Sequence, residues 1–360
     1  MVPKYARPEL EAPLARVAQR VDEAIDGLRP YGRSALWGEA IAATLALSRA
    51  GTHLLRAQLV LLGSLAGGGP AEGAALERVA TGVELLHLFL LVHDDVMDNA
   101  ALRRGRPTLR VALAAADPDL GAREARDLAI VMGNLLDVLA MRHLMPNGGG
   151  AGEEAAAALV LEACCRAGAG QFHDLLGLRG LGDDEEALRR EIIDKTAFHA
   201  FAAPLAAGLH LAGAGQRAAA ATAWGSHLGL AFQGADDLAD LVGSPAKTGK
   251  DALRDLLEDR TSLPLFFLRR RATGDDRELL EGMAARHALD IGERAHLHRL
   301  VKGCHVVDAC AAWVRDEVAA AARAREESGF SRAASEGLSA IEQGLCAHLE
   351  RVAASAEEDD

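Results

Sequence analysis

The sequence contains few aromatic residues, few lysines and no cysteine pattern that is typical of a metal or disulfide site. Aromatic residues make up 4% of its 360 residues, whereas alanine and leucine, both strong helix formers, supply much of the apolar content. The five cysteines are odd in number and form no CxxC pair, which argues against a zinc site and a disulfide framework. We therefore expect a helical, cytoplasmic protein whose thiols are reduced and buried.

Positive charge is scarce as well. Lys and Arg total 39 against 52 Asp and Glu, which gives a formal net charge of −13, and only five of the 39 are lysines. A surface this acidic repels the phosphates of nucleic acids and anionic lipids, so neither is an expected partner. A small ligand that carries phosphate would need a local reversal of charge.

The sequence also lacks a convincing targeting or membrane segment. Its first residues contain no apolar core of a signal peptide. Residues 196–216 and 218–235 carry no charged side chain, but both contain histidine and glycine, and the second runs directly into Asp236. We predict that both stretches are buried helices and that the chain has no stable membrane span.

Apolar residues recur with helical spacing along nearly the whole chain. Helices are expected over residues 9–28, 35–48, 51–66, 73–98, 122–145, 151–178, 185–212, 215–242, 250–272, 276–289, 293–325 and 332–355. The glycine-rich breaks between them are short enough for loops within one domain, and no strand pattern is convincing. We predict an all-α domain over residues 1–360 with a frayed acidic tail at 356–360.

Two clusters of the form Asp-Asp-x-x-Asp follow apolar helical runs. Asp94 and Asp98 belong to the first cluster, and Asp236 and Asp240 belong to the second. At a spacing of four residues, both carboxylates lie on one face of a helix and repel each other. A magnesium ion can compensate this charge, because it binds one or two carboxylates together with substrate phosphates. Two such clusters facing each other across a bundle predict a magnesium–diphosphate site.

Two other patterns lack the context that their chemistry requires. The acidic run at 183–186 follows a glycine and has no apolar helix before it, so we expect a solvated helix start. The segment from Gly243 to Lys250 differs from a P-loop in its glycine spacing, and no strand precedes it. The acidic run is therefore expected to be solvated, and the segment from Gly243 to Lys250 is not a nucleotide-binding P-loop.

These clusters occur within an ordered set of motifs that resembles the trans-isoprenyl diphosphate synthases (polyprenyl synthetases) over roughly residues 35–270. The set comprises His87, Asp94-Asp-Val-Met-Asp98, Arg103-Arg104-Gly-x-Pro-Thr108, Gly170-Gln171, Lys195-Thr196-Ala197, Phe232-Gln233, Asp236-Asp-Leu-Ala-Asp240, Gly249-Lys250, Asp255-Leu256 and Ser262-Leu263-Pro264. The resemblance implies a single large helical bundle around a central cavity and a homodimer. It also implies a prenyltransferase that joins an allylic prenyl diphosphate to isopentenyl diphosphate, with three Mg²⁺ in each active site.

The resemblance also assigns roles to individual residues. Magnesium would be bound by Asp94, Asp98 and Asp236, and Asp240 would assist at the metal site through its outer shell. The allylic diphosphate would contact Arg103, Lys195 and Lys250, while Thr196 and Gln233 would turn oxygen dipoles toward the developing cation. Isopentenyl diphosphate would be bound by Arg56, His87 and Arg104, together with the residue at position 53.

Position 53 departs from the family pattern, because histidine stands where a lysine is usual, and Ala57 replaces a proline. Neutral histidine binds a diphosphate less strongly than a permanent cation does. His53 therefore favours an alternative, a terpene cyclase acting on one prenyl diphosphate, whereas Arg56, His87 and Arg104 argue against it. A non-catalytic partner subunit of a heteromeric synthase is a second alternative, and the two intact aspartate motifs argue against that.

Product length in such enzymes is limited by residues one or two turns before the first aspartate. Phe89 lies five residues before Asp94, about 7.5 Å back along the helix, and no insertion lengthens the first cluster. This arrangement resembles that of the geranylgeranyl diphosphate synthases. We therefore predict a C20 product and assign Phe89 to the floor of the apolar tunnel.

Overall fold

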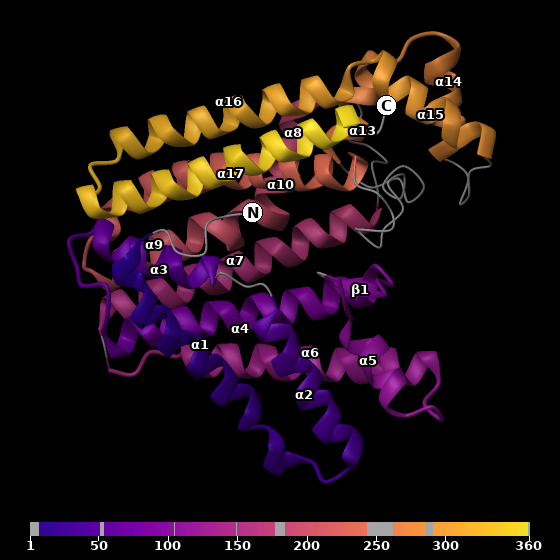
Figure 1. Ribbon diagram of the computed structural model, residues 1–360. Coiled ribbons are helices and arrows are strands. Elements are labelled where there is room, and N and C mark those ends of the chain that lie inside the picture. The colour runs from indigo at the N-terminus through magenta and orange to yellow at the C-terminus, as the bar shows by residue number, and fades with distance from the viewer. Residues whose placement is uncertain are drawn as a thin grey trace.

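The computed structural model describes residues 7–50, 54–103, 105–148, 150–176, 184–242, 262–284 and 291–358. Across these ranges the chain is helical apart from one two-stranded hairpin, which confirms the all-α prediction. Long helices lie side by side, with α16 and α17 along one face of the bundle and α1 and α2 near the opposite face (Figure 1).

The first half of the chain builds the part of the bundle around α4. Its elements are η1 (Pro8–Leu10), α1 (Glu11–Asp26), η2 (Arg29–Tyr31), α2 (Ala35–Arg49), α3 (Leu55–Ala66), α4 (Ala74–Met97), β1 (Leu102–Arg103), β2 (Arg106–Pro107), α5 (Leu109–Ala116) and α6 (Ala122–Leu144). Helix α4 packs against α6, α3 and α1. Because neighbours cover it on several sides, its residues from Val79 to Leu88 are buried.

The second half is centred on α10. Its elements are α7 (Ala151–Leu176), α8 (Glu185–Ile192), the π-helix η3 (Ile193–Ala202), α9 (Ala203–Leu211), η4 (Gly215–Arg217), α10 (Ala218–Val242), α13 (Leu263–Arg271), α14 (Asp275–Ala284), α15 (Ile291–Gly303), α16 (Val306–Glu327) and α17 (Arg332–Glu358). Helix α10 packs against η3, α16 and α17. The apolar stretches at 196–216 and 218–235 lie mostly in this core.

Glycine allows two helix pairs to approach closely. A Cβ added at Gly63 of α3 would lie 2.0 Å from the Leu205 carbonyl oxygen of α9, so no larger residue fits without moving the backbone. A Cβ added at Gly229 of α10 would lie 2.2 Å from the Ala197 Cβ of η3. The second contact holds η3 directly against α10, which brings the predicted site motifs of both segments together.

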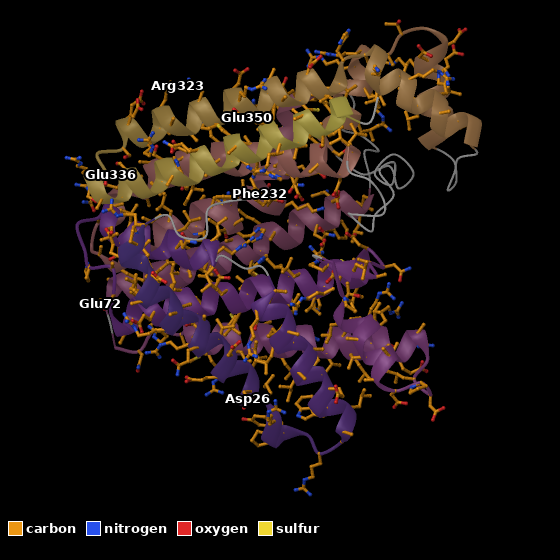
Figure 2. The ribbon with its side chains drawn as sticks, in the orientation of Figure 1. Asp26, Glu72, Phe232, Arg323, Glu336 and Glu350 are labelled. Atoms are coloured by element: carbon orange, nitrogen blue, oxygen red, sulfur yellow. The ribbon has the colours of Figure 1, made fainter. Side chains whose placement is uncertain are left out.

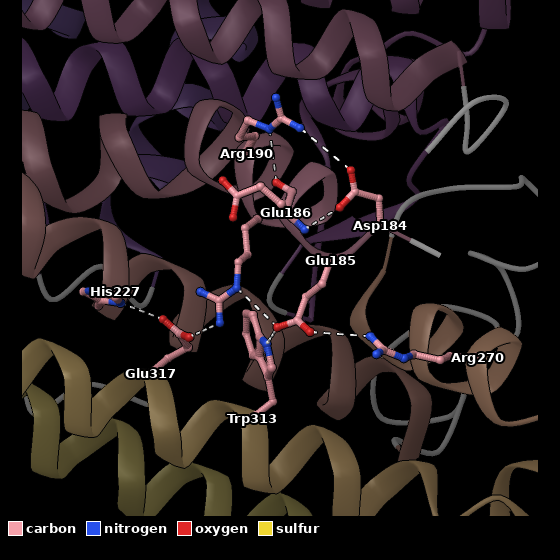
Figure 3. Close-up of polar contacts among 9 residues, drawn as sticks. Asp184, Glu185, Glu186, Arg190, His227, Arg270, Trp313 and Glu317 are labelled. Atoms are coloured by element: carbon pink, nitrogen blue, oxygen red, sulfur yellow. Dashed lines mark hydrogen bonds and ion pairs between the residues drawn. The ribbon is translucent and has the colours of Figure 1, made fainter. Parts of the chain in front are cut away.

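The outer helix α16 is joined to α8 and α10 by a polar network around the buried Glu317 (Figure 3). Glu317 is only 4% exposed and accepts hydrogen bonds from Arg189 and from His227 Nδ1, the latter at 2.8 Å. Burial tends to raise the pKa of Glu317, but these two partners outweigh it and lower the pKa. Trp313 Nε1 donates to Glu185 at 3.0 Å. The network therefore holds the start of α8, and through it η3, against the bundle.

Charged side chains point outward from the surface helices. Figure 2 shows Arg323 of α16 and Glu350 of α17 on the outside of the molecule, whereas Phe232 of α10 lies in its interior. The sequence predicts a frayed tail over 356–360, and α17 continues to Glu358. Among the helices that the structure describes, none combines the length and apolar character of a membrane span.

Three local features differ from the sequence prediction. The hairpin β1–β2 and helix α5 lie where no element was expected, because two-residue strands and an eight-residue helix leave little periodic signal. The helix expected over 293–325 is broken at His305, whose φ is 49°. The thiols were expected to be buried, but only Cys310 is buried and Cys165 is exposed, although all five cysteines are unpaired as expected.

Candidate active site

The first aspartate motif lies at the C-terminal end of α4. Asp94 and Asp95 occupy the last turn, Asp98 is the C-cap, and Asn99 leaves the helix with a φ of 50°. The backbone carbonyls at this end give it a partial negative charge, which disfavours carboxylates. Placing three aspartates here therefore requires positive charge from elsewhere in the site.

Arg103 supplies part of that charge from the hairpin that follows α4. Its Nε donates to Asp95 Oδ1 at 2.6 Å, and its Nη2 donates to Asp94 Oδ2 at 2.6 Å. Asp95 is only 3% exposed, and burial raises the pKa of its carboxyl to about 6 although the guanidinium opposes the shift. The tight turn between β1 and β2, with Gly105 at a φ of 74°, brings Arg103 back onto the helix end.

The second motif lies at the C-terminal end of α10. Asp236 is exposed, and Asp237 and Asp240 are half-buried. One turn earlier, Gln233 Nε2 donates to Asp237 Oδ1 at 2.7 Å, and Gln233 Oε1 accepts from the Thr196 hydroxyl at 2.9 Å. The predicted residues Thr196 and Gln233 are thus in direct contact.

Lys195 precedes Thr196 on the π-helix η3 and is held by a buried carboxylate. Its Nζ donates to Asp174 Oδ2 of α7 at 2.5 Å, and Asp174 is only 2% exposed. Gly170, one turn before Asp174, allows this approach, because a Cβ there would lie 2.5 Å from the Lys195 backbone nitrogen. Gly170 therefore serves packing, and Asp174 orients the lysine.

Two of the residues assigned to isopentenyl diphosphate share a small cavity. Arg56 from the first turn of α3 and His87 from α4 line it together with His199 of η3. The other lining residues are apolar and come from α4, α7 and α9: Val83, Leu86, Val160, Ala163, Ala203 and Pro204. Burial and the charge of Arg56 lower the pKa of His199 to about 3, so this imidazole is neutral.

Phe89 is half-buried and contacts His93, four residues later on α4, edge to face with ring centroids 4.6 Å apart. It packs against the main hydrophobic core. Its position, one to two turns before Asp94, suits a residue that limits the depth of an apolar tunnel. That Phe89 forms the floor of this tunnel stays a prediction.

The C-terminal ends of α4, α7 and α10 lie at the same end of the bundle (Figure 1). This arrangement brings Asp94, Asp174 and Asp236 from three separate parts of the sequence to one side of the molecule. Three predicted site residues, His53, Arg104 and Lys250, lie outside the described residues.

Within the described ranges, no three side chains of His, Cys, Asp or Glu gather closely enough to enclose a metal ion. The carboxylates assigned to magnesium instead lie in two pairs, Asp94 with Asp98 at the end of α4 and Asp236 with Asp240 at the end of α10. All of the donors are oxygens, and paired carboxylates leave coordination positions for phosphate and water, as magnesium sites commonly do. The donor set thus fits magnesium bound jointly by protein and diphosphate.

Sequence reasoning missed three residues that the structure places in contact with the predicted site. Asp95 and Asp237 are the middle members of the two motifs, and each contacts a predicted residue. Asp174 lies three residues after Gln171, less than one helical turn away, so it could have been included with that motif. The middle aspartates differ from their neighbours in side-chain direction, and that direction depends on contacts with Arg103, Gln233 and Leu263 that helical periodicity does not specify.

A helical bundle that gathers two aspartate motifs, a lysine and an arginine at one end is suited to bind a diphosphate together with a divalent metal. The family model for polyprenyl synthetase matches residues 40–301, so the chain belongs to the polyprenyl synthetase family and is a prenyltransferase. This confirms the resemblance seen in the sequence.

Individual relatives agree with this assignment. The chain is 34% identical over 235 residues to a short chain isoprenyl diphosphate synthase of Methanothermobacter thermautotrophicus, covering 65% of this chain and 68% of the relative. It is 33% identical over 266 residues to a geranylgeranyl diphosphate synthase of Mycobacterium tuberculosis, covering 71% and 70%. Other matches are named for heptaprenyl and octaprenyl products, so product length varies within the family.

The fold matches solved structures of the same family. The geranylgeranyl pyrophosphate synthase of Corynebacterium glutamicum, crystallised with isoprenyl diphosphate and magnesium, superposes with a TM-score of 0.79 over 96% of this chain and 99% of that one. The two sequences are 20% identical, so this likeness concerns the fold.

Proposed function

We propose that the protein condenses an allylic prenyl diphosphate with isopentenyl diphosphate to form a longer trans-prenyl diphosphate. The observation that carries this proposal is the contact between Thr196 and Gln233, at the end of the bundle where Asp94 and Asp236 lie. This contact supports the proposal because it joins two side-chain oxygens that are suited to stabilise a cation.

The reaction breaks the C–O bond of the allylic diphosphate and forms a C–C bond from the double bond of isopentenyl diphosphate, after which a proton is lost. Magnesium, when bound by Asp94, Asp98, Asp236 and Asp240, would neutralise charge on the diphosphate. Arg103 and Lys195 would contact the diphosphate oxygens. Each is oriented by a carboxylate, Asp95 or Asp174, that is almost fully buried.

The cavity lined by Arg56 and His87 suits the second substrate. Its cation, imidazole and apolar walls are the groups that a diphosphate joined to a short hydrocarbon would contact once the cavity opens to admit it. His53 and Arg104 complete this site by resemblance. A cyclase has no use for a second diphosphate site, so Arg56 and His87 favour condensation.

We assign a C20 product, geranylgeranyl diphosphate, on the position of Phe89. Its ring is packed against His93 and the core, which limits how far it can move aside. A longer product would need a smaller side chain at this position. The Mycobacterium tuberculosis relative named for this product supports the same choice.

Exposed apolar side chains on α6 and on α7 support the homodimer implied by the family. On α7, the exposed side chains include Leu161, Phe172, Leu175 and Leu176, and Phe172 is 63% exposed. Val131 and Val138 are exposed on α6 and lie on one face of it, seven residues apart. Exposing such apolar side chains to water is unfavourable, and a second copy of the chain would remove that exposure by covering them. The five unpaired thiols suit a reducing compartment, and we place the protein in the cytoplasm.

The decisive test is incubation of the full-length protein with magnesium, farnesyl diphosphate and labelled isopentenyl diphosphate. We expect label in a C20 diphosphate. An unlabelled hydrocarbon or alcohol would indicate a cyclase, and no turnover would indicate a non-catalytic subunit. Light scattering should give twice the mass of one chain, and a mass of one chain would contradict the homodimer.

A further inference from the structure

Asp237, the middle aspartate of the second motif, directs its carboxylate at two protein groups. Oδ1 accepts from Gln233 Nε2 at 2.7 Å, and Oδ2 accepts from the backbone nitrogen of Leu263 at 2.9 Å. Its neighbour Asp236 is exposed, and consecutive helical residues point about 100° apart. Asp237 therefore faces the bundle, whereas Asp236 faces solvent.

The contact with Gln233 determines which end of the amide faces Thr196. An ionised carboxylate can only accept hydrogen bonds, so the NH₂ group of Gln233 must face Asp237. The carbonyl oxygen of the amide then faces Thr196, and the Thr196 hydroxyl must donate to it at 2.9 Å. Without Asp237, the amide could rotate by half a turn and present its NH₂ group to the site.

The contact with Leu263 fixes the carboxylate itself. Leu263 begins α13, where backbone N–H groups lack intrahelical partners, and the adjacent Ser262 makes no side-chain cap. A carboxylate is favoured at a helix N-terminus. Leu263 is fully buried, so this bond holds Asp237 between two ordered helices.

We propose that Asp237 is a positioning residue that sets the Gln233 amide, and that it does not bind the metal. This inference rests on the proposed function, in which the oxygens of Gln233 and Thr196 face an allylic cation. A carbonyl oxygen stabilises a nearby cation, whereas an NH₂ group would repel it. Asp237 thus acts on the chemical step through Gln233 and leaves substrate binding largely unchanged.

Asp237→Asn tests the proposal, because an asparagine keeps the size of the side chain but can accept at only one end. It cannot satisfy Gln233 Nε2 and the Leu263 nitrogen together without placing two donors face to face. We expect kcat to fall about 10- to 100-fold, with each KM within about threefold of the original. Binding of magnesium with inorganic pyrophosphate, measured by calorimetry, should change less than about twofold.

A double-mutant cycle with Gln233→Leu isolates the route of the effect. If Asp237 acts through the amide, Asp237→Asn should lower kcat by less than about threefold in the Gln233→Leu background. A loss as large as in the wild-type background would overturn the proposal. So would a tenfold or larger loss of magnesium–pyrophosphate affinity, which would make Asp237 a metal ligand.

Asp237→Glu extends the test and serves if the asparagine variant does not fold. Glutamate keeps two acceptor oxygens and the charge, so it should retain more than about a tenth of the wild-type kcat. A kcat below a tenth of the wild-type value, or a loss of kcat equal to that of Asp237→Asn, would overturn the proposal. Turnover by the wild-type protein is a separate result: without it the proposed function fails, and the variants then carry no information about Asp237.

Discussion

Helices α4 and α10 end in the same Asp-Asp-x-x-Asp pattern, but the middle aspartates meet different partners. Asp95 of α4 is buried and accepts from the guanidinium of Arg103 at 2.6 Å. Asp237 of α10 is half-buried and accepts from the amide of Gln233 and from a backbone N–H. One carboxylate therefore orients a cation, and the other orients a neutral dipole.

This difference matches what a prenyl transfer requires of the two helices. The departing diphosphate is anionic, and Arg103 beside α4 can stabilise it. The allylic fragment is cationic, and oxygens beside α10 can stabilise that. One copy of the motif can thus help to stabilise an anion and the other a cation, because the residues around the middle aspartate differ.

The largest expected effect comes from removing the feature that the two motifs share. Asp94→Asn and Asp236→Asn each remove a carboxylate proposed to bind magnesium, and each should lower kcat/KM about 1000-fold, equivalent to about 4 kcal/mol. Steady-state kinetics with labelled isopentenyl diphosphate measures this. The control is Glu186→Gln, an exposed residue of the acidic run at the start of α8. Activity within about threefold of wild type in either aspartate variant would contradict the metal assignment.

A second variant addresses the charge on the α4 side. Arg103→Gln removes the cation that Asp94 and Asp95 share, and we expect a loss of about 100-fold in kcat. Arg106→Gln is the matched control, because Arg106 is exposed on the other strand of the same hairpin. If both variants lose activity equally, the hairpin as a whole matters and Arg103 has no special role.

Much of the fold could be predicted from the sequence because the helices depend on local patterns of residues. Alanine and leucine at helical spacing, interrupted by glycine, predicted most helices and the all-α class. The break at His305 was missed, because a left-handed histidine leaves the apolar period intact on both sides. The hairpin carrying Arg103 was missed because each strand has only two residues.

The site was predictable where one helical turn determines the spacing. Asp94 with Asp98, and Gln233 with Asp236, could be read as sharing helix ends. The partners Asp174 of Lys195 and Leu263 of Asp237 lie 21 and 26 residues away in sequence. Those contacts depend on how α7, η3, α10 and α13 pack, and local periodicity does not specify packing.

The phenylalanines that precede the two motifs offer a third, smaller test of the comparison. Phe89 lies five residues before Asp94, and Phe232 lies four residues before Asp236, where it contacts Phe201 with ring centroids 5.4 Å apart. If only α4 borders the tunnel floor, Phe89→Ala should shift the main product from C20 to longer chains, and Phe232→Ala should not. Chromatography of the dephosphorylated products measures this. An unchanged product with Phe89→Ala would mean that this residue is not the floor.

The smallest effect concerns the stability of the fold around the cavity that Arg56 and His87 line. His199 faces Arg56 of α3 and His87 of α4 there, and its pKa is lowered from 6.5 to about 3 by burial and by Arg56. Below pH 6.5 the imidazole binds a proton in the unfolded chain but stays neutral in the folded one. Its contribution to the free energy of unfolding is therefore complete above pH 6.5 and is lost as the pH falls toward 3. His199→Leu should therefore reduce the slope of unfolding free energy between pH 6 and pH 5 by up to about 1.4 kcal/mol per pH unit. Urea unfolding at both pH values measures the slope, with His173→Gln, an exposed histidine of α7, as the control. Equal slopes in His199→Leu and wild type would mean that this imidazole titrates alike in the folded and unfolded chains.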